Sequence, residues 1–210
     1  MSSPTDPMTA AEPGAEDADN QVVIARQAIL DENRAVFGYE LFDRSTATHS
    51  HTAASDAALL FNALCYAGSE ALGSKKIVFI NCTHESLAGG HLELVHPEKV
   101  VLEVPTLAAN ATPEQIEQLL PTLQALRTRG FRLAFSQDVL RRAYGSWLPL
   151  ANFIKLDMLA IKPELIEPLV KYVRANAQAT LIAEKVETAE QHERMAALGV
   201  KLFQGYWFAR

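Results

Sequence analysis

The chain has 210 residues, 49% of them apolar, which is enough for one globular domain with a substantial core. Its 19 basic and 25 acidic residues give a formal net charge of −6. Residues 1–20 contain five of the acids and no base, which leaves 20 acids against 19 bases in the rest of the chain. This balance excludes an electrostatic case for binding nucleic acid or an anionic membrane. We expect residues 1–20 to form a disordered acidic leader and residues 21–210 to form one domain.

Three features of the sequence predict the compartment: the lengths of its apolar runs, its N-terminal residues and the surroundings of its two cysteines. No apolar run is long enough to cross a bilayer, and the N-terminus lacks the basic start and apolar stretch of a signal peptide. Cys65 and Cys82 both lie among apolar residues, so we interpret them as reduced core residues. The sequence therefore predicts a cytoplasmic protein without a membrane segment.

The first predicted elements form a hairpin and a helix. The segments "QVVIARQAIL" and "AVFGYELF" flank the polar "DENR", which indicates two strands around a turn. A polar stretch follows, and residues 57–72 then have apolar side chains at helical spacing.

Strands and helices then alternate to the end of the chain. Short apolar strands are predicted at residues 76–82, 99–104, 131–135, 152–157, 179–184 and 200–205. Helices are predicted between most of them, at residues 112–129, 138–145, 162–177 and 188–198. The first of these four helices has Thr112 as its N-cap, Pro113 in its first turn and Gly130 at its end.

This order favours a modified TIM-type (β/α)8 barrel. Nearly continuous apolar strands that alternate with helices are typical of a buried parallel sheet. The opening hairpin makes the first strand antiparallel to the second. A doubly wound open sheet is the alternative fold, but no GxGxxG follows any predicted strand.

Polar side chains mark the carboxyl ends of the predicted strands, where a TIM barrel carries its site. Carboxylates and amides are the ligands that a hard divalent cation prefers, and a lysine among them could assist a hydrolytic water. Each of these residues alone would also serve as a helix cap or a solvated strand end. The residues are Glu40, Asn81, Glu103, Ser136, Gln137, Lys155, Asp157, Glu184, Glu187 and Gln204.

Seven segments together resemble a known family. In chain order they are "GYELFDR", "FINCT", "VVLEVPT", "GFRLAFSQD", "FIKLD", "AEKVET" and "QGYWFAR". This set resembles the EAL domain, a family of bacterial phosphodiesterases that linearise cyclic di-GMP, with their inactive relatives. The first segments also resemble the branch in which a degenerate EAL domain precedes an HDOD domain. Glu40, Leu41 and Phe42 stand where Glu-Ala-Leu is usual, and the resemblance implies that the last helix of the barrel is missing.

The resemblance implies a role for most of the strand-end residues. Glu40, Asn81 and Glu103 correspond to metal ligands of the family, and Arg44 corresponds to an arginine that contacts the substrate phosphate. Lys155 corresponds to the catalytic lysine. The ligand-binding candidates that the resemblance implies are Glu40, Arg44, Asp157, Glu184, Glu187 and Gln204.

Two departures from the family pattern argue against hydrolysis. Active members carry adjacent aspartates, which bind and bridge two metals, where this chain has Ser136 and Gln137. Neutral oxygens do not supply the anionic charge that holds two close dications. Thr106 also replaces a glutamate that braces the following loop in the family. We therefore expect Lys155 and Glu184 to be vestigial catalytic residues, with no metal cofactor.

Three functions follow from these observations. The first is an inactive EAL-like regulatory module that binds a protein partner or a fused HDOD-type domain. The second is a module that binds cyclic di-GMP without hydrolysing it. The third is an active phosphodiesterase, which would use Mg²⁺ or Mn²⁺ and release linear pGpG.

Overall fold

A computed structural model describes residues 24–43 and 76–209 of the chain. The leader predicted at residues 1–20 and the helix predicted at residues 57–72 lie outside the described residues. Eight strands form a closed barrel in which each strand pairs with the next and the last pairs with the first. The strands are β1 (Ile24–Asp31), β2 (Val36–Asp43), β3 (Ile77–Asn81), β4 (Val100–Glu103), β5 (Arg132–Ser136), β6 (Phe153–Asp157), β7 (Thr180–Glu184) and β8 (Leu202–Phe203).

The predicted hairpin and the antiparallel first strand are confirmed. β1 pairs antiparallel with β2, and the remaining neighbours from β2 to β8 are parallel. The barrel closes where β1 pairs antiparallel with the short β8, through Leu30 opposite Phe203 and Asp31 opposite Leu202. Closure excludes the open doubly wound sheet.

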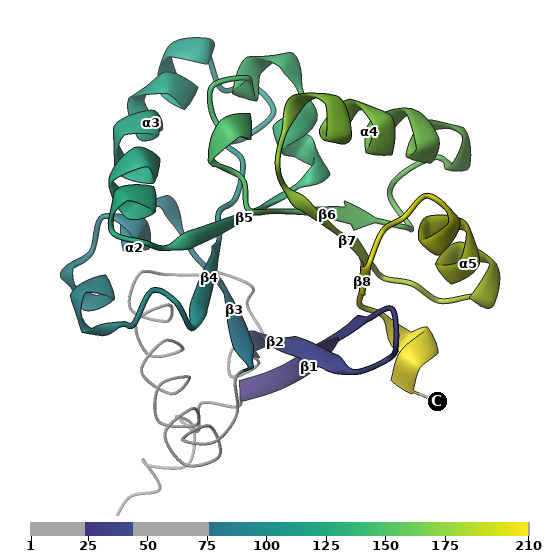
Figure 1. The fold of residues 1–210 in the computed structure, drawn as a ribbon. Helices are drawn as coiled ribbons and strands as arrows, with labels where there is room; N and C mark the ends of the chain where they lie inside the picture. Colours follow the sequence, from purple (N-terminus) through teal and green to yellow (C-terminus); the bar gives the residue numbers. More distant parts are fainter. Residues whose placement is uncertain (1–23, 44–75, 210) are drawn as a thin grey trace, which may run out of the picture.

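Helices cover the outside of the barrel, as Figure 1 shows for α3, α4 and α5. Local sequence explains their ends, because α3 and α5 each begin with a capping box, at Thr112 and Thr188, and Gly130 follows α3 with a φ of 94°. No helix among the described residues has the length and apolar character to span a bilayer. The helices are α2 (His84–Leu87), α3 (Pro113–Thr128), α4 (Pro163–Asn176) and α5 (Ala189–Ala197).

The segment after β5 differs from the single short helix predicted at residues 138–145. It forms three short 3-10 helices, Gln137–Leu140, Arg142–Tyr144 and Leu148–Leu150. Two buried aromatic side chains hold it against neighbouring elements. The Tyr144 hydroxyl accepts a hydrogen bond from the Leu107 N–H at 2.9 Å, and Trp147 Nε1 donates to the Ile116 carbonyl at 3.2 Å. These tertiary contacts outweigh the local preference for one continuous helical turn.

The barrel interior contains an apolar layer near the amino ends of the parallel strands. Phe79 and Phe153 pack edge to face with ring centroids 5.1 Å apart, and partly buried Phe37 and Ile77 pack against this layer. We call it the inner apolar layer, and its buried members are Ile29, Phe79, Val101, Ala134, Phe153, Ile182 and Leu202. The outward-facing apolar residues of the strands pack against the helices in a second, larger core.

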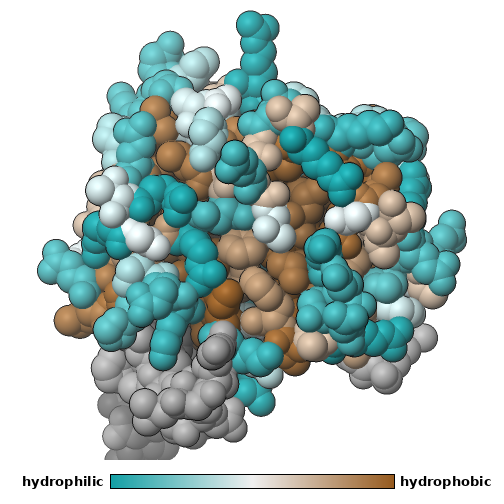
Figure 2. Space-filling view, viewed as in Figure 1, coloured by the Kyte–Doolittle hydropathy of each residue, from teal (hydrophilic) through white to brown (hydrophobic). Residues whose placement is uncertain are grey.

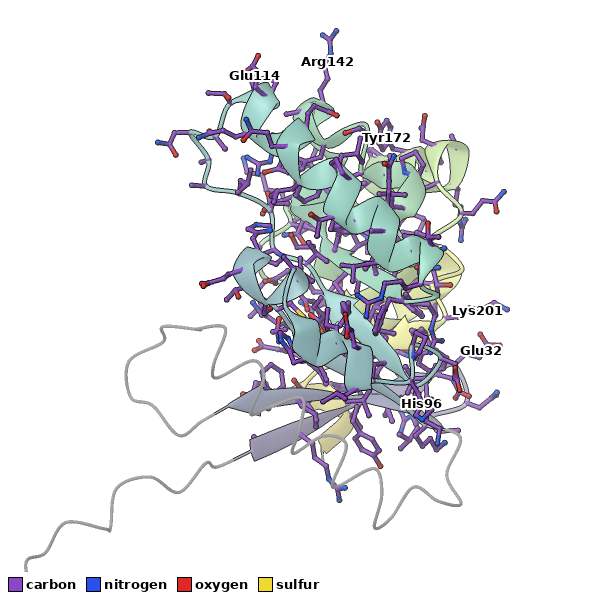
Figure 3. The ribbon with its side chains drawn as sticks, turned by 90° about the vertical axis from the view of Figure 1, so that its left-hand side faces the viewer. Glu32, His96, Glu114, Arg142, Tyr172 and Lys201 are labelled. Atoms are coloured by element: carbon purple, nitrogen blue, oxygen red, sulfur yellow. The ribbon has the colours of Figure 1, made fainter. Side chains whose placement is uncertain are left out.

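The two ends of the barrel can be located in the figures. Glu32, His96 and Lys201 lie together on one side of Figure 3, and they come from the β1–β2 turn and from the segments that lead into β4 and β8. This side is therefore the amino end of the parallel strands, and Figure 2 views it. Hydrophobic residues lie in the centre of that face and hydrophilic residues surround them.

We expect Phe79→Ala to destabilise the fold strongly, because Phe79 is fully buried in the inner apolar layer. Truncating a buried phenylalanine to alanine costs about 3–5 kcal/mol. Urea unfolding followed by circular dichroism measures the change. Leu94→Ala is the control, since that side chain is 78% exposed and should change the free energy of unfolding by less than about 0.5 kcal/mol. Equal effects of both substitutions would contradict the assigned core.

Candidate functional site

The strand alternation turns the inner apolar layer into a polar layer at the carboxyl end of the barrel. Side chains two residues apart on a strand point to the same side. Phe79 is therefore followed inside the barrel by Asn81, Val101 by Glu103, and Phe153 by Lys155. The same step leads to Glu184 on β7 and to Gln204 just after β8. With Glu40 of β2, these residues make up what we call the charged layer: Glu40, Asn81, Glu103, Lys155, Glu184 and Gln204.

Lys155 is the centre of the charged layer. Its Nζ lies 2.8 Å from Glu40 Oε2, 2.9 Å from Glu103 Oε2 and 3.1 Å from Glu184 Oε2. Its side chain is only 7% exposed, and those of the three glutamates are 6%, 11% and 18% exposed. One ammonium thus pairs with three carboxylates from three other strands, β2, β4 and β7.

Amide side chains complete the contacts of Glu40. Asn81 Nδ2 donates to Glu40 Oε1 at 3.1 Å, and Gln204 Nε2 donates to Glu40 Oε2 at 2.6 Å. Gln204 Nε2 also lies 3.1 Å from Gln27 Oε1 on β1. The chain next to Gln204 needs glycine, because a Cβ at Gly205, whose φ is 157°, would overlap the backbone of Val186.

Burial and charge act in opposite directions on Lys155. Desolvation favours its neutral form, but the three carboxylates outweigh desolvation and raise its pKa above the ordinary value. Burial raises the pKa of Glu103 to about 8, although Lys155 acts to lower it, and nearby Glu40 and Glu184 raise it further. Lys155 therefore stays charged at neutral pH, and Glu103 holds its proton more tightly than an exposed glutamate.

The end of β5 contributes no charge to this layer. Ser136 is the N-cap of the following 3-10 helix, where its Oγ accepts a hydrogen bond from the Asp138 N–H at 3.4 Å. Gln137 Oε1 accepts a hydrogen bond from the Asp157 N–H at 3.1 Å. Both side-chain oxygens are thus engaged by backbone N–H groups.

Asp157 pairs with Lys185, one residue beyond β7. Asp157 Oδ2 lies 2.5 Å from Lys185 Nζ, and Asp157 Oδ1 accepts hydrogen bonds from the N–H groups of Leu159 and Ala160 at 2.8 and 3.0 Å. Burial disfavours the charged carboxylate, but these hydrogen bonds outweigh it and hold the pKa of Asp157 below its ordinary value. Lys185 has a φ of 55°, a left-handed conformation that is uncommon outside glycine.

Not every residue predicted from the sequence reaches the charged layer. Glu187 is exposed, and its N–H donates to Gln191 Oε1 at 2.8 Å in the cap of α5. Arg44 lies outside the described residues. Cys82 is partly buried against the outer core, with its Sγ 3.5 Å from the Ile80 carbonyl oxygen.

Sequence reasoning missed two residues of this end of the barrel, Lys185 and Gln27. Lys185 lies in the sequence between Glu184 and Glu187, which were both site candidates. Its position could therefore have indicated that it lies at the same end of the barrel. Gln27 is a polar residue in the apolar first strand, two positions before buried Ile29. Its alternation with Ile29 indicates an inward-facing side chain.

The donor set does not fit a pair of divalent cations. Two close dications need bridging anionic oxygens, and Ser136 and Gln137 are neutral and already accept hydrogen bonds. The three glutamates of the charged layer converge on the Lys155 ammonium. Within residues 24–43 and 76–209, no group of three or more His, Cys, Asp or Glu side chains is arranged to hold a metal ion.

Comparison with known proteins assigns the family. The EAL domain model matches residues 76–210, so the chain belongs to the EAL domain family. A Vibrio cholerae protein named cyclic di-GMP phosphodiesterase CdgJ is 28% identical over 93% of this chain and 45% of its own length. Bacillus subtilis YuxH is 26% identical over 90% of this chain and 47% of its own length. The chain thus spans less than half the length of both curated relatives.

Solved structures share the fold. The EAL domain of Mycobacterium smegmatis DcpA has a TM-score of 0.71 and 19% identity, over 90% of this chain and 92% of that one. Klebsiella pneumoniae BlrP1, solved with manganese and cyclic di-GMP, has a TM-score of 0.68 and 22% identity, over 90% of this chain and 56% of that one. These similarities support the barrel architecture.

We expect Lys155→Met to destabilise the barrel in a pH-dependent way. Removing one partner of a buried ion pair costs about 3–5 kcal/mol, and here three carboxylates lose their cation. Without the ammonium, the buried carboxylates bind protons more tightly in the folded state than in the unfolded state. The variant should therefore gain stability as the pH falls, and its deficit relative to wild type should be smaller at pH 5 than at pH 8.

Urea unfolding at the two pH values measures this deficit. Lys201→Met is the control, because Lys201 is 71% exposed and its Nζ is 3.8 Å from Glu32, so its removal should have little effect at either pH. A deficit for Lys155→Met that is small, or equal at both pH values, would contradict the role of Lys155 as the common counter-ion.

Proposed function

We propose that this chain is a non-hydrolytic EAL domain that works as a regulatory signalling module, mainly through contact with another protein. The observation that carries the proposal is the end of β5. There Ser136 and Gln137 replace an acidic pair, and both side-chain oxygens are engaged by backbone N–H groups. The proposal includes the absence of a metal cofactor.

Loss of both metal ions should lower the rate of hydrolysis so far that we expect no activity rather than reduced activity. Two-metal hydrolysis depends on one metal to activate the attacking water and on the other to stabilise the leaving oxygen. Loss of both metals removes both effects together. Removing a single transition-state donor elsewhere costs about 10²–10³-fold, so we expect a much larger loss here.

Cyclic di-GMP is a second candidate ligand, which the module would bind without cutting. Glu184 and Gln204 lie at the carboxyl end of the barrel, and the resemblance adds Arg44, Glu187, Glu40 and Asp157 to the candidate contacts. The charges of the described residues argue against tight binding of an anionic dinucleotide. The cation at the centre of the layer, Lys155, is already paired with three carboxylates. We therefore favour a protein partner.

An active phosphodiesterase is the competing function. Its support is the name of CdgJ and the presence of Glu40, Asn81, Glu103, Lys155, Glu184 and Gln204 at the positions that the family pattern requires. In that case the chain would need Mg²⁺ or Mn²⁺ and would release linear pGpG.

The partner and compartment are part of the proposal. The resemblance to the branch with an HDOD domain favours a fused domain of that type, or a separate protein, as the binding partner. The cysteine content favours a cytoplasmic location.

Chromatography of cyclic di-GMP incubated with the purified chain tests the proposal. With Mg²⁺ or with Mn²⁺, we expect no linear product above the level of a protein-free control. Lys155→Met serves as the matched background, because both the proposed and the competing function predict no turnover for it. Wild-type and variant samples should therefore be indistinguishable.

Metal-dependent conversion by the wild type that Lys155→Met abolishes would overturn the proposal and establish the phosphodiesterase. Calorimetric titration of cyclic di-GMP in the presence of EDTA separates the two non-hydrolytic hypotheses. Absence of heat up to high micromolar ligand would support a protein-binding module, and saturable heat would support a nucleotide receptor.

A further inference from the structure

Lys185 lies one residue beyond β7 in a backbone conformation that few residues other than glycine adopt, with a φ of 55°. In a strand that continued past Glu184, the side chain of Lys185 would point to the opposite side of the sheet from that of Glu184. The left-handed turn breaks this alternation, and Lys185 Nζ lies 2.5 Å from Asp157 Oδ2. The uncommon backbone conformation thus accompanies one specific ion pair.

Asp157 and Glu184 lie side by side at the ends of neighbouring strands. They are opposite each other in the parallel pairing of β6 with β7, so their side chains point to the same side of the sheet. The side chain of Asp157 is 11% exposed and that of Glu184 is 18% exposed. Two carboxylates that are this close and this buried repel each other, so each needs a cation nearby.

Each of these two carboxylates has its own ammonium partner. Glu184 Oε2 lies 3.1 Å from Lys155 Nζ, whereas Asp157 Oδ2 pairs with Lys185. The hydrogen bond to Asp157 raises the pKa of Lys185 above its ordinary value, and the charges of Asp157 and Glu184 add to this effect, although burial and the charge of Lys155 oppose it. Lys185 is therefore an ammonium at neutral pH.

We propose that Lys185 is a built-in counter-ion that takes the place of a divalent cation at Asp157 and so excludes metal ions from this carboxylate. An ammonium and a divalent cation compete for the same carboxylate oxygen, and a group attached to the chain competes at a high effective concentration. The inference rests on the proposed absence of a metal cofactor. It adds a cause to that absence, because a cation of the chain occupies Asp157 in addition to the neutral residues at the end of β5.

The role of Lys185 can be tested without disrupting the barrel. Its side chain is 55% exposed, and an ion pair that is open to solvent contributes little to stability. Asp157 Oδ1 would keep its hydrogen bonds from the N–H groups of Leu159 and Ala160, which stabilise the ionised carboxyl. Removal of the ammonium should therefore leave a folded chain in which Asp157 Oδ2 has lost its cation.

Four variants separate charge from backbone effects. Lys185→Met removes the ammonium and keeps an unbranched side chain. Lys185→Gly also removes it and fits the left-handed backbone without strain, so it provides the test if Lys185→Met does not fold. Lys185→Arg keeps the positive charge and is the matched control. Lys201→Met removes a lysine that is 71% exposed at the amino end of the barrel, and it controls for the loss of one positive charge.

Titration with Mn²⁺ alone at pH 7, followed by the electron paramagnetic resonance signal of the free ion, is the measurement. We expect Lys185→Met and Lys185→Gly each to bind one Mn²⁺ per chain with a dissociation constant of about 10⁻⁴–10⁻³ M, as in weak Ca²⁺ sites. The wild type, Lys185→Arg and Lys201→Met should bind at least about tenfold more weakly. Addition of Asp157→Asn to Lys185→Met should abolish the new binding. Circular dichroism confirms that each variant is folded.

Three results would overturn the inference. The first is binding to the wild type or to Lys185→Arg that is as tight as binding to Lys185→Met. The second is no saturable binding to Lys185→Met and Lys185→Gly. The third is new binding that survives Asp157→Asn, which would place the ion at another site. Each differs from a failure of the proposed function, which would be conversion of cyclic di-GMP by the wild type.

Discussion

The contact between the Lys155 ammonium and three glutamates is the interaction on which the carboxyl end of the barrel depends. It joins β6 to β2, β4 and β7, and it reaches residues as far as 115 positions away in the chain. Burying a carboxylate without a partner costs several kcal/mol, so three of them in one layer require a cation at their centre. Strand alternation fixes where this layer begins, because five of its six residues follow a buried residue of the inner apolar layer by two positions: Asn81, Glu103, Lys155, Glu184 and Gln204.

The same interaction bears on the proposed loss of hydrolysis. Three carboxylates of the charged layer converge on one ammonium, and the neutral residues Ser136 and Gln137 stand at the end of β5. Those two residues stabilise the local backbone. Ser136 caps a 3-10 helix, and Gln137 Oε1 accepts a hydrogen bond from the Asp157 N–H. Asp157 is neutralised by Lys185. The residue types and their positions on the strands resemble those of a hydrolytic centre. Their side chains, however, form ion pairs and hydrogen bonds with one another.

Much of the fold and of the charged layer could be predicted from the sequence because the strands are short, apolar and regularly spaced. The hairpin, the parallel strands and the convergence of Glu40, Asn81, Glu103, Lys155, Glu184 and Gln204 follow from that pattern and from the geometry of a barrel. The pairing of Lys155 with three acids does not follow, because it depends on distances between strands far apart in sequence. The left-handed backbone at Lys185 and the 3-10 segments held by Tyr144 and Trp147 also required tertiary contacts that local propensity does not encode.

Calorimetric titration of Mn²⁺ into the wild type and into the double variant Ser136→Asp/Gln137→Asp tests the central claim most directly. The account predicts no saturable binding to the wild type at neutral pH. It predicts new saturable binding to the double variant, which restores anionic ligands at the end of β5. Saturable binding of two Mn²⁺ ions per wild-type chain would contradict the account, because it would show that the carboxylates around Lys155 still hold a two-metal centre.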